Sequence, residues 1–156
     1  MKSLDKNKIL IFGVGNNGRQ DDGLGWAFLD FLERLNLDLD IEYRYQLQIE
    51  DAEMLLNYNT VVFVDATKEK TENGYVFKEC PASKEYSFST HALRPETIMY
   101  LSHSIYNHFP KAYILGIEGY EWELQIGLTK KAKQNLDCVT KVFKEKLLND
   151  YIYINN

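Results

Sequence analysis

Short apolar runs alternate with segments of helical periodicity along almost the whole chain, and this alternation is the feature that most constrains the fold. Five runs have the length, apolar content and flanking residues typical of strands: residues 8–12, 41–47, 60–65, 74–78 and 112–117. Helical patterns fill the stretches between and after these runs: residues 24–35, 50–57, 95–108 and 130–147. Such an alternation predicts an α/β domain with three α/β/α layers around a mostly parallel sheet.

One connection is too short for an all-parallel sheet. Only eight charge-rich residues, 66–73, separate the third expected strand from the fourth. A crossover between parallel strands needs about a dozen residues or more, usually including a helix. We therefore expect residues 74–78 to run antiparallel to the third strand or to a neighbour of that strand.

Composition narrows the class of protein. With 156 residues, 45% of them hydrophobic, the chain is expected to form a single domain over residues 1–156, with its core between about 8 and 148. A net charge of −5 without a basic stripe argues against a nucleic-acid partner. No signal peptide and no apolar run of about 18 residues is evident, so we expect a cytoplasmic protein that does not enter the membrane.

A glycine-rich loop after the first strand, GVGNNGRQDDGLG at residues 13–25, carries the strongest motif. Its first six residues satisfy G-x-G-x-x-G, a dinucleotide-binding pattern, which leaves a nucleotide as one interpretation. However, Asp21 and Asp22 stand where the next helix begins and would repel a pyrophosphate, and no acid ends the second strand. We therefore interpret the loop as one that serves a cation. For Asp21 itself, complementing the helix dipole is the favoured interpretation.

Three ligand-type side chains are expected at one edge of the sheet. Asp22 follows the first strand, Asp65 ends the third, and His91 lies in the loop that returns from the antiparallel strand. Sites in such sheets collect beyond the carboxyl ends of the parallel strands, and the return loop is long enough to recross the sheet at about 3.3 Å per residue. Two carboxylates and one imidazole form a suitable set for a divalent metal, with positions left open for a substrate.

The motifs FGVGNNGRQDDGLG, VVFVDA, STHAL, and ILGI followed by IGLT resemble those of the hydrogenase maturation proteases, in the same order and over residues 8–148. The resemblance implies a mixed five-stranded sheet with one antiparallel strand. It also implies a nickel-dependent endopeptidase that recognises Ni²⁺ in the precursor of a NiFe-hydrogenase large subunit and removes its C-terminal extension. In this family, the nickel-contacting positions correspond to Asp22, Asp65 and His91, and the nickel arrives with the precursor.

The chain departs from the family pattern after its second strand, where many members have a Gly-Gly turn and this chain has QLQIE at residues 46–50. We interpret this segment as lining the substrate cleft. No Ser–His or Cys–His nucleophile pair is evident, so no catalytic residue is assigned beyond the metal ligands. A monomer is expected. The alternative is that the chain is a non-catalytic assembly factor that binds the nickel-loaded partner without cleaving it.

Overall fold

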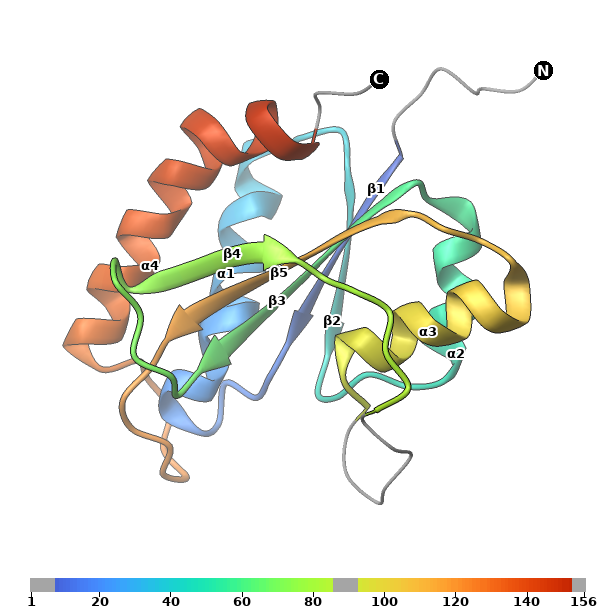
Figure 1. Cartoon of the computed structure of the whole chain (residues 1–156). Coiled ribbons are helices and arrows are strands. Elements are labelled where there is room, and N and C mark those ends of the chain that lie inside the picture. The colour runs from blue at the N-terminus through green and yellow to red at the C-terminus, as the bar shows by residue number, and fades with distance from the viewer. Residues whose placement is uncertain (1–7, 86–92, 153–156) are drawn as a thin grey trace.

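A computed structural model describes residues 8–85 and 93–152, which form one five-stranded sheet covered on both faces (Figure 1). The strand order is β2-β1-β3-β5-β4. The strands are β1 (Ile9–Val14), β2 (Asp40–Arg44), β3 (Thr60–Thr67), β4 (Tyr75–Glu79) and β5 (Lys111–Glu118). All neighbouring strands pair in parallel except β4, which pairs antiparallel with β5. The expected mixed sheet is confirmed, with the antiparallel strand beside a neighbour of β3.

Two layers of helices cover the sheet (Figure 1). The helix α1 (Leu24–Leu35) packs beside α4 (Lys130–Val142), which continues as the π-helix η3 (Phe143–Ile152). The opposite face carries α2 (Glu50–Met54), the 3₁₀ turn η2 (Leu55–Asn57) and α3 (Pro95–Tyr106). A further 3₁₀ turn, η1 (Gln20–Gly23), leads directly into α1. The three-layer prediction is therefore confirmed.

The central strands are apolar throughout because both of their faces are buried. In β1, Ile9 and Ile11 pack with the α1 and α4 layer, whereas Leu10 and Phe12 pack with the α2 and α3 layer. Phe12 also stacks on Phe63 of β3, with ring centroids 5.5 Å apart. The run of consecutive apolar residues thus reflects a strand enclosed by two cores.

The second strand is shorter than its alternating pattern predicts. It ends at Arg44, because that residue pairs with Val14, the last residue of β1. The Arg44 carbonyl then accepts hydrogen bonds from Gly15 N at 2.9 Å and from the Trp26 indole at 3.1 Å. Beyond Val14, β1 has no residue left to pair with. The alternating apolar residues that follow Arg44 therefore lie outside the ladder.

The last helix begins where its sequence predicts. Thr129 is the N-cap, and its Oγ1 accepts a hydrogen bond from Ala132 N at 3.2 Å. The lysines of this last helix are exposed, as expected of a solvated face. Within residues 8–85 and 93–152, no helix has the length and apolar character needed to cross a bilayer.

The first turn of α1 lies directly against the ends of two strands. A Cβ atom at Gly25 would stand 2.7 Å from the Val14 carbonyl oxygen and 2.8 Å from that of Val64. Both oxygens belong to the backbone of central strands and cannot move aside easily. The helix is therefore seated on the carboxyl ends of β1 and β3, where the sequence places the candidate site.

We expect Gly25→Ala to lower the free energy of unfolding by about 1–2 kcal/mol, measured by urea denaturation. Replacing a helical glycine by alanine normally stabilises a protein by about 0.5–1 kcal/mol, but overpacking against fixed atoms costs about 1–3 kcal/mol. Gly18→Ala is the control, because its Cβ would meet only the Asn16 side chain, at 3.1 Å. A Gly25→Ala variant as stable as the wild type would show that the helix can withdraw from the sheet.

Candidate functional site

The glycine-rich loop folds back on itself so that Asp22 is fixed at the sheet edge. Gly15 has a φ of 151°, and a Cβ atom there would collide with the Asp22 carbonyl oxygen. The same carbonyl oxygen accepts a hydrogen bond from Asn16 N at 3.0 Å. The position thus requires glycine, because only glycine permits this backbone conformation and this close approach. The second glycine of the motif thus lets the loop backbone pass close to Asp22.

The first acid of the pair is fully buried and holds together three segments of the chain. Asp21 has an exposed fraction of 0%. Its Oδ2 accepts hydrogen bonds from Tyr120 N at 2.7 Å, Glu121 N at 3.2 Å and the Thr129 hydroxyl at 2.8 Å. Its Oδ1 accepts one from Thr129 N at 2.8 Å. Asp21 lies in the first turn of η1, where a helix dipole favours an acid, and in addition its carboxylate joins η1 to the loop after β5 and to the start of α4.

Gln20 reinforces the same junction. Its φ of 49° is unusual for a residue with a side chain. The strained backbone is held by hydrogen bonds from Gln20 N to Gln125 O at 2.8 Å and from Glu123 N to Gln20 Oε1 at 2.9 Å. Sequence reasoning missed this role because the partners lie more than 100 residues away, and no local pattern marks them.

The second acid of the pair, Asp22, is near enough to Asp65 for its negative charge to act on that carboxyl. Both side chains are partly buried. Burial raises the pKa of Asp65 to about 7, and the negative charge of Asp22 adds to the increase, while a hydrogen bond from Ala66 N opposes it. Burial also raises the pKa of Asp22, against the opposing charges of Arg19 and Lys68. The raised pKa values mean that both carboxylates resist ionisation. A cation bound between them would favour their ionised forms.

The third predicted ligand, His91, lies outside the described residues, so its place in the site stays a prediction. Among residues 8–85 and 93–152, no three metal-binding side chains gather at one point. Leu93, at the end of the return loop, forms an isolated antiparallel bridge with Leu47. Of the three predicted residues, Asp22 and Asp65 interact through their charges, and their sharing of one metal site stays a prediction.

A cavity of about 410 Å³ opens beside Asp65. Its walls combine charged and apolar side chains. The apolar ones come from β1, β3, β4, β5, the segment after β2 and the end of the return loop: Val14, Leu47, Phe63, Val76, Leu93 and Ile114. Glu96 also lines it, and among residues 8–85 and 93–152 its buried Oε1 has no hydrogen-bond partner, although the Arg94 Nε lies 3.5 Å away. Leu47 belongs to the 46–50 segment, so that segment borders this cavity, and its role in a substrate cleft stays a prediction.

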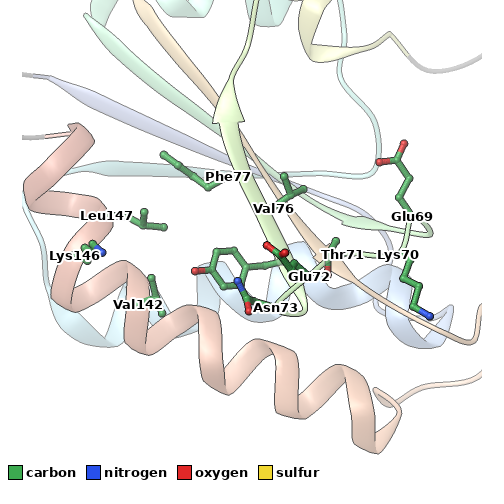
Figure 2. A pocket seen from close by; sticks show the side chains of 11 residues that line it. Glu69, Lys70, Thr71, Glu72, Asn73, Val76, Phe77, Val142, Lys146 and Leu147 are labelled. Carbon is green, nitrogen blue, oxygen red and sulfur yellow. The ribbon is translucent and has the colours of Figure 1, made fainter.

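A second cavity, of about 650 Å³, lies between β4 and the C-terminal helix (Figure 2). Residues 69–77 form one side, and Val142, Lys146 and Leu147 form the other. Neither Asp22 nor Asp65 borders it. This larger cavity is therefore separate from the predicted cation site. The smaller cavity, lined by Asp65, is the one that borders that site.

The backbone amides at the start of η1 are engaged within the protein. Gln20 N donates to Gln125 O, Asp21 N to Glu121 O at 3.0 Å, and Asp22 N to Arg19 O at 3.1 Å. A phosphate-binding helix terminus works through free N–H groups that point at the anion. The structure therefore weakens the dinucleotide interpretation of the G-x-G-x-x-G pattern.

Comparison with known proteins relates this geometry to a set of solved structures. No protein-family model matches the sequence, and neither does any curated protein sequence. The NiFe hydrogenase maturation protease HycI from Thermococcus kodakarensis superposes with a TM-score of 0.73 at 20% identity, over 94% of this chain and 96% of its own. The hydrogenase maturating endopeptidase HybD from E. coli has a TM-score of 0.64 at 21% identity, over 88% of this chain and 93% of its own.

A hydrogenase 2 maturation peptidase from a Thaumarchaeota archaeon gives the same TM-score, 0.64, at 20% identity, over 90% of this chain and 98% of its own. The chain is thus a three-layer α/β protein with an acidic site region at the carboxyl edge of its sheet. More particularly, it has the fold of the hydrogenase maturation proteases. The resemblance carried by its motifs is confirmed at the level of the fold.

We expect Asp21→Asn to lower the free energy of unfolding by about 2–4 kcal/mol, since an amide offers one acceptor oxygen and leaves buried donors unpaired. Asp22→Asn is the matched control, because the neighbouring carboxylate is only partly buried, and a change below about 1 kcal/mol is expected there. Thermal and urea unfolding of both variants would measure the difference. Equal effects would contradict the structural role of Asp21.

The raised pKa of Asp65 gives a pH-dependent prediction for the nickel-free chain. The carboxyl titrates near 7 in the folded state and near its ordinary value of 3.8 when unfolded. Ionising it therefore costs stability progressively as the pH rises from about 4 to about 7. We expect Asp65→Asn to be more stable than wild type by about 1–3 kcal/mol at pH 8, with no advantage at pH 4.

Urea unfolding at the two pH values, in the presence of a chelator, would measure this effect. A uniform loss of stability in Asp65→Asn at both pH values would show instead that the carboxylate supports the fold.

Proposed function

We propose that this chain is a nickel-dependent endopeptidase that acts on the precursor of a NiFe-hydrogenase large subunit and removes its C-terminal extension. The observation that carries the proposal is the pair Asp22 and Asp65, two partly buried carboxylates with raised pKa values at the carboxyl edge of the sheet. The shared fold supports the choice of reaction, because the superposed proteins are described as hydrogenase maturation proteases and endopeptidases. The proposal includes a monomer that acts in the cytoplasm, as expected from the sequence.

In this proposal, nickel is part of the substrate and is contacted by Asp22, Asp65 and His91. Carboxylate oxygens and an imidazole nitrogen form a donor set that suits divalent metals of this kind. Metal ligands must be deprotonated, and a cation would favour the ionised form of Asp65 that the protein alone disfavours. When bound, the metal would polarise a scissile carbonyl and acidify a water molecule, or serve as the feature by which the precursor is recognised.

The cavity beside Asp65 would receive the peptide next to the scissile bond. It adjoins one of the two carboxylates, and the apolar part of its walls can take side chains from an extended segment. Leu47 would help to shape this cleft, so the segment at residues 46–50 would contribute to the choice of precursor.

Processing of the nickel-loaded precursor is expected to fall at least about 10-fold in Asp22→Asn and in Asp65→Asn, the scale on which contacts around a metal matter. Glu123→Gln is a matched control, because this exposed acid lies near the same edge and uses only its backbone to bind Gln20. A gel-shift assay follows the shortening of the precursor. Full activity in both aspartate variants would refute the proposed role of the pair.

The same preparations separate the alternative functions. An assembly factor would bind the nickel-loaded precursor without shortening it. A dinucleotide-binding protein would bind nucleotide, and Asp22→Asn would strengthen that binding by removing a charge near the pyrophosphate. A nucleotide titration of wild type and Asp22→Asn beside the processing assay would distinguish these outcomes.

A further inference from the structure

Two large aliphatic side chains stand out from the loop that follows β5. Leu124 is 79% exposed and Ile126 is 85% exposed. This loop lies below the arrowhead of β5, close to the glycine-rich loop that carries Asp22 (Figure 1). Exposed aliphatic residues are common singly on protein surfaces, but two together at the rim of a candidate site call for an explanation.

The loop is held firmly in this exposed position. Gln125, which stands between the two aliphatic residues, forms an isolated parallel bridge with Arg19. Its N–H donates to Gly18 O at 3.0 Å, and its carbonyl accepts from Gln20 N at 2.8 Å. The buried Asp21 fixes the preceding residues of the same loop. Gln125 is thus fixed to the glycine-rich loop, while Leu124 and Ile126 on either side of it remain exposed.

A hollow lies next to Ile126. This cavity of about 250 Å³ is bordered by Ile126, Leu128, Trp26 and Tyr43, among others. Tyr45, which is 70% exposed, lies against Trp26 with ring centroids 5.0 Å apart. The apolar surface thus continues from Ile126 to the start of α1 and the end of β2, with Leu124 exposed two residues before Ile126.

We propose that Leu124, Ile126 and the recess beside Trp26 form a docking surface for the folded body of the protein substrate, which meets it with an exposed apolar patch of its own. This inference rests on the proposed function. The loop is paired with residues 18–20, immediately before Asp22. A protein whose scissile bond reaches Asp22 and Asp65 must therefore come close to Leu124 and Ile126. A second copy seated on the same rim would cover the edge that the substrate has to enter.

A few side chains buried at the centre of an interface supply most of its binding energy, and burying exposed apolar side chains favours association. A rigid loop also avoids part of the ordering cost of association, since its backbone is already fixed before the partner arrives. The docking surface would let the enzyme bind the folded precursor separately from the contacts at the metal and the cleavage site.

The double variant Leu124→Ser/Ile126→Ser tests the docking surface. Binding of the nickel-loaded precursor, measured by biolayer interferometry, is expected to weaken at least 10-fold. In the processing assay, KM is expected to rise by a similar factor while kcat changes less than 2-fold. The matched control is Ile105→Ser/Phe109→Ser, which removes two apolar side chains that are 60% and 63% exposed and lie at or beyond the C-terminal end of α3, before β5 begins. This control should bind and process like wild type.

The outcomes distinguish the docking surface from the proposed peptidase activity. Unchanged binding in the double variant, or an equal loss in the control, would overturn the docking surface. So would concentration-dependent self-association of the wild type, measured by sedimentation, that disappears in the double variant. If the wild type binds the precursor through these residues but never cleaves it, the docking surface holds and the peptidase proposal fails.

Discussion

The buried carboxylate of Asp21 is the interaction on which the candidate site depends. It gathers hydrogen bonds from the loop after β5 and from the N-cap of α4, segments about 100 residues away in sequence. A buried charge is tolerated only when its oxygens are fully paired, so the three segments hold one another in place. This junction fixes both the neighbouring Asp22 and the loop that presents Leu124 and Ile126.

The two adjacent acids of the glycine-rich motif, Asp21 and Asp22, thus differ in how far their carboxylates are satisfied by hydrogen bonds. Backbone and hydroxyl donors satisfy Asp21, so this residue contributes to the fold. Asp22 and Asp65 lie close to each other, and burial raises their pKa values without an equal compensation from neighbouring groups. Natural proteins place such destabilising arrangements at functional sites, because the ligand supplies the missing charge. This contrast supports the proposal that Asp22 and Asp65 contact a cation.

Periodicity and connection length predict most of this fold from the sequence. The layers and the antiparallel β4 follow from local patterns, because buried strands and short connections have few alternatives. The end of β2 does not follow from its own alternation, since it is set by the length of β1. The roles of Gln20 and Asp21 could not be predicted, because their partners are distant in sequence. Asp22 and Asp65 were predictable, since strand ends and a glycine-rich motif mark them. His91 lies outside the described residues and remains a prediction.

Mass spectrometry of the hydrogenase precursor would test the central claim most directly. The purified chain would be incubated with the precursor in its nickel-loaded form and, separately, in its metal-free form. The proposed function predicts that only the nickel-loaded precursor loses a single C-terminal segment, with a mass that identifies one cleavage site. Equal cleavage of both forms would contradict nickel recognition, and an intact precursor in both would contradict the peptidase activity itself.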